Sequence, residues 1–243
     1  MHNMNPPDKL SRRSLRNEIF DVLHNRLIAG ELQPGQWLRQ DEIASQLGVS
    51  MTPVREALDQ LVAAGLAQRE PYRGVRVIEL THEEMLDAYG LRLMIEPAAA
   101  RLASATTGQV KRQELKRLLE RTMELVRLTD MSRLRELSRQ FHAMIVEMSG
   151  SPLLARVYEV AANKFPDWML YEAMFRHPKK LKASLRDEQQ QHRAIVDAIL
   201  AHDAKAAACA ARNHLLSLGN DLHVYLSIPR EKILEKEKQF PLL

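Results

Sequence analysis

The stretch from residue 40 to residue 58 constrains the fold most strongly, because it has the pattern of two short helices joined by a tight turn. Gly48 stands where the first helix must stop, a position that favours a residue without a Cβ. Thr52 and Pro53 then predict a hydroxyl cap and a proline at the first position of the second helix. Apolar residues recur at helical spacing in both halves, at Ile43, Ala44, Leu47, Val54, Ala57, Leu58 and Leu61. Such a pair is a helix-turn-helix, whose second helix can protrude into a DNA major groove.

The amino end of the second helix carries side chains suited to DNA. The hydroxyl groups of Ser50 and Thr52, together with free backbone amides, can bind phosphate. Arg55 lies one turn further on and can reach a guanine edge with two hydrogen bonds. The alternative is a helical hairpin with ordinary caps and a solvated arginine, and helix chemistry alone does not separate the two interpretations.

Residues 66–78 favour the DNA-binding interpretation. They predict a short strand, a turn around Pro71 and Gly74, and a second strand with alternating apolar residues. A hairpin directly after a recognition helix is a wing, and Arg73 at its tip could enter a minor groove.

These segments together resemble the winged helix of the GntR family of transcription regulators, over roughly residues 10–78. The motifs that carry the resemblance are Ser50-x-Thr52-Pro53-Val54-Arg55-Glu56-Ala57-Leu58, Gly65-Leu66 and Arg73-Gly74-x-x-Val77. The resemblance implies a DNA-binding surface made of Ser50, Met51, Thr52, Arg55, Arg73 and Gly74. Met51 is a departure, since the family often has a DNA-contacting arginine at that position, so the operator half-site need not be the usual one.

Composition limits the class of protein without identifying a DNA binder. The chain has 243 residues, enough for one or two domains, and a net charge of +4. Residues 1–78 hold ten Lys and Arg against nine Asp and Glu, so positive charge is not concentrated there. Cys209 is the sole cysteine, which excludes an intrachain disulfide and suits a reducing cytoplasm. No apolar run approaches 18 residues and the start lacks the core of a signal peptide, so we expect a cytoplasmic protein with no membrane contact.

The rest of the chain predicts helices. Thr81 to Glu84 has the pattern of a capping box, and we place the domain boundary just before it. About six helices are expected, at 82–105, 108–128, 131–149, 152–176 with a bend or break at Pro166, 180–201 and 203–228. The predicted fold is therefore mainly α, with a winged helix-turn-helix in residues 1–78, an all-α six-helix bundle in 79–230, and a charged, loosely held tail in 231–243.

Three motifs in this second part resemble the FCD ligand-binding domain of the FadR subfamily. They are Leu91-Arg92-Leu93-Met94-Ile95-Glu96-Pro97, Phe141-His142 and Gln191-His192-Arg193-Ala194-Ile195. The resemblance implies an effector-binding and dimerisation domain with a cavity for a small carboxylate. It also implies that Arg92 faces the cavity, where a guanidinium can clamp a carboxylate with two hydrogen bonds. Asn163, Trp168, Tyr171 and Arg176 are further candidates for the cavity wall.

Three histidines are predicted to face a shared interior. His142, His192 and His214 each lie on or beside the apolar face of a different helix. A lone buried histidine is usually a hydrogen-bonded core residue, whereas three on different helices favour a metal site. His2, His24, His82, His177, His202 and His223 lack such a cluster and are interpreted as surface or capping residues.

The FCD resemblance implies a divalent metal bound by an aspartate and three histidines, with the aspartate one turn before the first histidine. Here Ser138 occupies that position. Two alternatives follow. Either His142, His192 and His214 retain a metal, zinc or nickel, with water or an effector carboxylate at the open positions, or the site is metal-free and the three imidazoles hydrogen-bond an effector directly. Arg92 and Ser138 are the residues expected to bind the effector. We favour the metal.

We therefore expect a DNA-binding transcription regulator, a repressor, that acts as a homodimer on an inverted-repeat operator and responds to a small organic acid. The alternative from another class is a metal-dependent enzyme that uses the three-histidine site, for which Glu188 is the nearby candidate base. A third alternative is an architectural protein whose helices serve only to dimerise.

Overall fold

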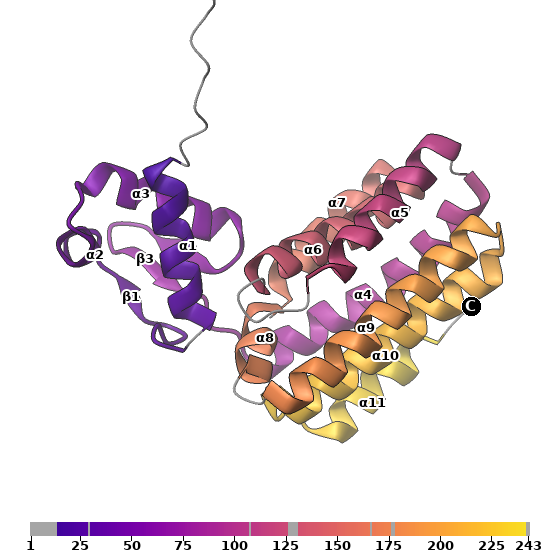
Figure 1. The fold of residues 1–243 in the computed structure, drawn as a ribbon. Helices are drawn as coiled ribbons and strands as arrows, with labels where there is room; N and C mark the ends of the chain where they lie inside the picture. The colour runs from indigo at the N-terminus through magenta and orange to yellow at the C-terminus, as the bar shows by residue number, and fades with distance from the viewer. Residues whose placement is uncertain are drawn as a thin grey trace, which may run out of the picture.

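The computed structural model describes residues 14–28, 30–106, 108–125, 131–165, 167–175 and 178–241. A small winged helix lies at one end of an elongated helical domain (Figure 1). The winged helix contains α1 (Leu15–Ile28), β1 (Trp37–Leu38), α2 (Gln40–Leu47), α3 (Met51–Ala63), β2 (Ala67–Glu70) and β3 (Gly74–Val77).

The predicted helix-turn-helix is confirmed, with one correction at its turn. Gly48 ends α2 with φ 65°, a left-handed conformation in which its amide bonds back to the carbonyls of Ala44 and Ser45. The second helix begins at Met51, two residues earlier than predicted, so the proposed Thr52 cap is wrong and Ser50 is the N-cap. Pro53 fits the third helical position because the first amides of a helix have no intrahelical acceptor.

The wing is a three-stranded antiparallel sheet with the order β1-β3-β2. The two predicted strands, β2 and β3, pair from Ala67 opposite Val77 to Glu70 opposite Gly74. The third, β1, pairs Trp37 with Arg76 and was not predicted from the sequence. A two-residue strand has no readable alternation, so only its pairing with β3 reveals it.

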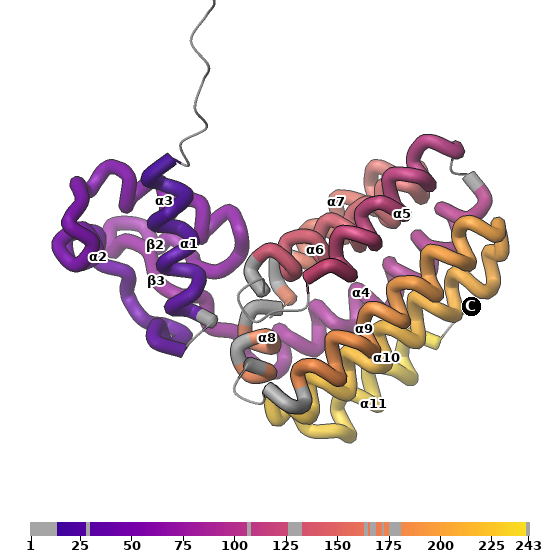
Figure 2. Tube along the Cα trace, in the orientation of Figure 1, coloured from indigo at the N-terminus to yellow at the C-terminus, as the bar shows by residue number. Residues whose placement is uncertain are grey.

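The helical part contains α4 (His82–Thr106), α5 (Gln109–Met123), α6 (Met131–Met148), α7 (Pro152–Lys164), α8 (Asp167–Phe175), α9 (Pro178–Leu200), α10 (Ala204–Leu226) and α11 (Arg230–Gln239). The capping box is confirmed, since the Thr81 amide donates to Glu84 at 2.9 Å and the Glu84 amide donates to the Thr81 hydroxyl at 3.2 Å. α4 runs through the middle, with α5, α6 and α7 on one side and α9, α10 and α11 on the other (Figure 2).

The described residues form eight helices in this part instead of six. The fourth predicted helix divides at Phe165, beside Pro166, into α7 and α8. The second predicted helix stops at Met123, whereas residues 126–130 lie outside the described part of the chain. Within the described residues, no helix is both long and apolar enough to cross a membrane.

The C-terminal segment is helical and packed, so the expectation of a loosely held tail is wrong. Ile233 of α11 is fully buried, and the Tyr89 hydroxyl lies 3.0 Å from both the Leu215 carbonyl and the Glu237 carboxylate. A Cβ at Gly219 would collide with the Tyr89 hydroxyl, so α10 depends on a glycine at this contact. This helix could not be predicted from the sequence, because most of its side chains are charged and few apolar residues mark a buried face.

One hydrophobic core connects the two parts of the molecule. Its buried members come from the winged helix, from α4, α10 and α11, and from Phe165 between α7 and α8. They include Leu23, Leu58, Val77, Leu80, Met85, Tyr89, Leu215, Leu222 and Ile233. A second core lies among α4, α5, α6, α9 and α10. The shared core fixes the start of α4 against the winged helix.

Candidate functional site

The three predicted histidines meet in the helical domain. His142 of α6, His192 of α9 and His214 of α10 are buried, and one ring nitrogen from each lies within 4.8 Å of the others. The ring centroids are 4.9 Å apart for His142 and His192 and 4.7 Å apart for His192 and His214. These histidines form a group that could hold a metal ion.

The hydrogen bonds of the imidazoles suit metal ligation. The Nδ1 atom of His214 lies 2.9 Å from the Gln191 side-chain oxygen, and that of His142 lies 3.0 Å from a Glu96 carboxylate oxygen. Because both partners are acceptors, Nδ1 of each ring donates the hydrogen bond and Nε2 is left to face a metal, as in imidazoles that bind metals. The Nε2 atom of His192 is buried and has no hydrogen-bond partner among the described residues. This orphaned atom fits a metal better than it fits a satisfied core histidine.

Burial keeps two of these imidazoles neutral. Burial, assisted by His214 and His142, lowers the pKa of His192 well below 6.5. Burial and His142 likewise lower the pKa of His214 to about 3. A neutral imidazole is the form that binds a metal ion, so this environment prepares the group for ligation.

Glu96 is a site residue that the sequence reasoning missed. Its carboxylate lies 2.6 Å from Arg92 Nε and 3.0 Å from His142 Nδ1, and both the Glu96 and the Arg92 side chain are almost fully buried. Burial alone would raise the pKa of Glu96, but Arg92 and His142 hold that pKa well below its usual value. The guanidinium of Arg92 also lies 4.5 Å over the Phe165 ring. The i, i+4 spacing of Arg92 and Glu96 is the signal that could have revealed the pair.

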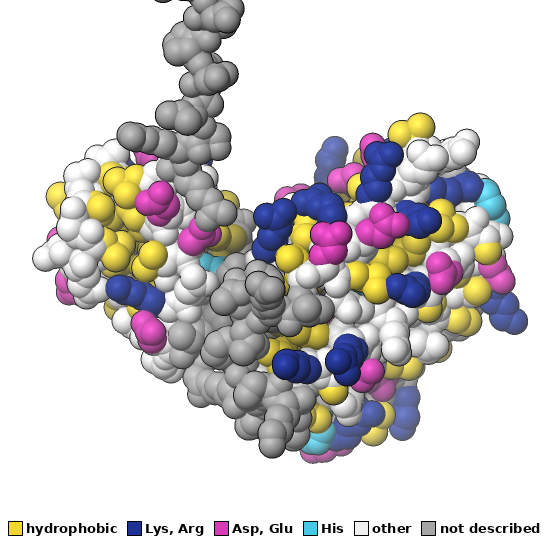
Figure 3. Space-filling model, viewed as in Figure 1, with side chains coloured by type: hydrophobic (Ala, Val, Ile, Leu, Met, Phe, Trp, Pro, Cys, Tyr) yellow, Lys and Arg dark blue, Asp and Glu magenta, His cyan; other side chains and the backbone are white. Residues whose placement is uncertain are grey.

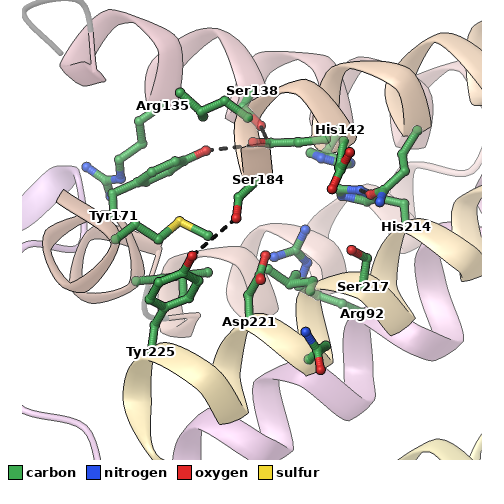
Figure 4. A pocket seen from close by; sticks show the side chains of 18 of the residues that line it. Arg92, Arg135, Ser138, His142, Tyr171, Ser184, His214, Ser217, Asp221 and Tyr225 are labelled. Carbon is green, nitrogen blue, oxygen red and sulfur yellow. Dashed lines mark hydrogen bonds between the residues drawn. The ribbon is translucent and has the colours of Figure 1, made fainter. Parts of the chain in front are cut away.

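A cavity of about 310 Å³ opens beside the histidines. Arg92, Ser138, His142 and His214 line it as expected, and Tyr171 also does, while Arg176 and the side chains of Asn163 and Trp168 lie outside the described part of the structure. Figure 4 shows Arg135 and Tyr171 on one side of the cavity and His142 and His214 on the other. The sequence reasoning missed several polar lining residues, which are Arg135, Arg139, Ser184, Ser217, Asp221 and Tyr225.

The cavity combines cationic and acidic side chains. Arg135, Ser138 and His142 follow one face of α6 at helical spacing, so the periodicity that placed His142 also points to Arg135. The Ser138 hydroxyl donates to Glu188 at 3.3 Å, and the Tyr171 hydroxyl donates to the same carboxylate oxygen at 3.4 Å. Burial and the charge of Glu188 raise the pKa of Asp221 to about 7.

His24 was interpreted as a surface or capping residue, and that interpretation is wrong. It is 2% exposed, where α1 packs near α6 and α8, and its ring stacks on Phe20. Its Nε2 atom lies 3.4 Å from Arg135, a residue of the cavity wall. Burial and the charge of Arg135 lower the pKa of His24 to about 4. Burial here arises from contact between the two domains, which helix periodicity cannot reveal.

The predicted DNA-binding residues lie at two exposed places on the winged helix. Ser50, Met51, Thr52 and Arg55 are exposed at the amino end of α3, with Met51 at 57%. Arg73 is exposed at the tip of the wing beside Gly74, whose φ is 112°. Tyr72, which the sequence reasoning missed, is fully exposed at the same tip.

Positive charge is not gathered on the winged helix. On the face shown in Figure 3, Lys and Arg side chains are sparse over the winged helix and more frequent over the helical domain. Two wing arginines are also paired, Arg69 with Asp59 and Arg76 with Glu70. Phosphate contacts must therefore come from a few placed side chains and backbone amides.

Comparisons with known proteins agree with this architecture. Residues 15–77 match the family described as bacterial regulatory proteins, gntR family, and residues 87–217 match the FCD domain. The chain is 30% identical to the probable D-xylose utilization operon transcriptional repressor of Paenarthrobacter nicotinovorans, over 85% of this chain and 88% of that protein. It is also 30% identical to the HTH-type transcriptional repressor GlaR of Escherichia coli K12, over 80% of this chain and 90% of that protein.

A solved structure shares the fold. E. coli McbR/YncC superposes with a TM-score of 0.61 at 24% identity, covering 89% of this chain and 99% of that chain. Relatives named repressors and regulators give the metal-dependent enzyme alternative no support. The chain belongs to the GntR family of bacterial transcription regulators, and it is a DNA-binding regulator with an FCD effector-binding domain.

Proposed function

We propose that this regulator is a repressor whose operator affinity is controlled by a small organic acid, bound with a divalent metal ion in the helical domain. The observation that carries the proposal is the convergence of three buried imidazoles, two of which, those of His142 and His214, line a cavity of about 310 Å³. Repression as the direction of control is supported by relatives that are named repressors.

His142, His192 and His214 would hold the metal ion, for which imidazole chemistry favours zinc or nickel. The bound ion would act as a Lewis acid that attracts a carboxylate oxygen of the effector. Glu96 would fix the ring of His142, and Gln191 would fix the ring of His214, through their Nδ1 hydrogen bonds.

The effector carboxylate would also meet arginine in the cavity. Arg92 is already paired with Glu96, so it would contribute to the charge and shape of the cavity wall and would not form a new ion pair with the effector. Arg135 of α6 lines the cavity too and would supply the direct contact to an anion. Ser138 would face the effector through its hydroxyl group.

On DNA, Ser50 and Thr52 would hold phosphate, Arg55 would read a base, and Met51 would contact the groove without the usual arginine. Arg73 and Gly74 would bring the wing to the minor groove. Binding in the cytoplasm to an inverted-repeat operator requires a homodimer. A dimer is supported by exposed apolar residues on adjacent faces of α4 and α7, which are Leu91, Met94, Leu153, Val157 and Val160.

DNA binding is tested by selecting duplexes from a random library and measuring their affinity at moderate salt. We expect a specific inverted repeat bound with micromolar or better affinity, and the absence of any specific duplex would refute the operator proposal.

Metal binding is tested separately, by elemental analysis of protein purified without a histidine tag. We expect near-stoichiometric metal that is lost in His192→Ala and retained in His82→Ala, a change at an exposed position at the start of α4. If the protein holds no metal even after soaking with zinc and nickel, the metal part of the proposal is wrong. The imidazoles would then contact the effector directly.

A further inference from the structure

A metal ion held by three neutral imidazoles would keep its full double charge in a buried site. Buried charge is costly unless an opposite charge lies beside it. Glu96 does not meet this need, because its own charge is already balanced by Arg92 at 2.6 Å. The site therefore calls for a further carboxylate.

Glu188 of α9 is placed to supply it. Glu188 lies one turn before His192, and its carboxylate oxygen is 3.8 Å from His192 Nε2, the buried atom for which the described residues offer no hydrogen bond. Two ligands bonded at about 2.1 Å in a tetrahedral site lie about 3.4 Å apart. The two atoms are thus too far apart for a hydrogen bond and close to the separation that a shared ion would impose.

Two hydroxyl groups orient this carboxylate from the cavity side. Ser138 of α6 and Tyr171 of α8 both donate to the oxygen that faces His192, at 3.3 and 3.4 Å. In Figure 4 the dashed lines from the Ser138 and Tyr171 hydroxyl groups end at the same oxygen. The side chain of Glu188 is 24% exposed, so it retains room to shift toward the histidines.

We propose that Glu188 is the fourth protein ligand of the metal, alongside His142, His192 and His214, and that Ser138 positions it. This inference rests on the metal site of the proposed function. It gives the serine at position 138 a role, since its hydroxyl holds a carboxylate that α9 provides. Zinc can expand from four to five ligands, so a position remains for an effector oxygen.

The test is the zinc affinity of the full-length protein, measured after removal of metal by competition with a chromophoric chelator. We expect Glu188→Gln to weaken zinc binding about 100-fold, at least as much as the loss of an outer-shell partner. The matched control is Asp197→Asn, the same charge change at an exposed position of α9, which should stay within about fivefold of wild type. Melting of the metal-free proteins checks that each variant folds.

Cobalt substitution supplies a readout that a purely electrostatic role would not change. The visible absorption of bound Co²⁺ should differ between wild type and Glu188→Gln and be identical in Asp197→Asn. If Glu188→Gln does not fold, Glu188→Asp keeps the charge but shortens the side chain by one methylene. A ligand role then predicts at least a tenfold loss of zinc affinity, by the same reasoning.

Unchanged zinc affinity in Glu188→Gln, or equal losses in Glu188→Gln and Asp197→Asn, would overturn the inference. If wild type itself binds no zinc, the inference falls together with the metal part of the proposed function. Operator binding by the same wild-type protein is measured independently, so its outcome separates a failed metal site from a failed regulator.

Discussion

Glu96→Gln should destabilise the protein strongly, although the two side chains have nearly the same shape. The side chains of Arg92 and Glu96 are 6% and 5% exposed, so the substitution leaves a buried guanidinium without its counter-charge. The glutamine oxygen can accept from Arg92 or from His142, and its amide group would face the other donor. Breaking a buried pair from one side costs about 3–5 kcal/mol, which is the loss of unfolding free energy that we expect.

The assay is urea unfolding at neutral pH, followed by circular dichroism. The double variant Arg92→Met, Glu96→Met removes both charges and should recover most of the lost stability, because a buried ion pair is often replaceable by apolar residues. A loss below about 1 kcal/mol in Glu96→Gln would refute the argument, since that is the size expected of an exposed pair. A double variant less stable than Glu96→Gln would refute it as well.

The pH dependence of the same comparison follows from the lowered pKa of Glu96. A carboxyl group whose pKa is lower in the folded state stabilises the protein above its unfolded pKa, near 4.5, and this contribution is lost as the pH falls through the folded value. The stability difference between wild type and Glu96→Gln should therefore narrow below about pH 4.5.

Three further predictions concern other parts of the molecule. The pKa of His24 is lowered to about 4 in the folded state, so below pH 6.5 the unfolded state binds more protons than the folded state. Urea unfolding is measured at pH 7 and at pH 5. Between these two pH values, wild type should lose about 2 kcal/mol more unfolding free energy than His24→Phe. Equal losses would contradict the burial of that imidazole. Gly219→Ala should cost about 1–3 kcal/mol in the same assay, whereas Gly108→Ala, where a Cβ meets nothing, should cost little. Arg55→Ala should weaken operator binding, measured by fluorescence anisotropy, by about 1–3 kcal/mol and relax the sequence preference. Arg101→Ala, at an exposed position of α4, should do neither. Equal weakening by both substitutions would mean that Arg55 contributes only non-specific charge attraction to DNA.

Local features of the fold could be predicted from the sequence. The capping box at Thr81 and Glu84 and the left-handed stop at Gly48 depend on residues within one turn of each other. The convergence of His142, His192 and His214 was also predictable, because each helix has an apolar face and a bundle has one interior. What these features share is that capping residues or helical periodicity within one segment are enough to predict them.

The remaining features depend on which surfaces meet. In the sequence, Glu96 looks like an ordinary helical residue. Its role becomes visible only in the structure, where α6 places His142 beside its carboxylate. His24 becomes buried only because α1 packs near α6 and α8. The helix at Arg230–Gln239 is held by Tyr89 and by the absence of a side chain at Gly219, and neither contact leaves a local trace in the sequence.

The continuous core of the winged helix, α4, α10 and α11 has a consequence for exchange of domains between relatives. The two family matches, residues 15–77 and 87–217, divide the chain into what look like interchangeable modules. Leu80, Met85 and Tyr89 of the junction, however, pack in the same core as Leu23 and Val77 on one side and Leu222 on the other. A chimaera that replaces only the winged helix would therefore mismatch buried side chains at the junction, and grafting a new DNA specificity onto this sensor requires the first turns of α4 to be transferred with it.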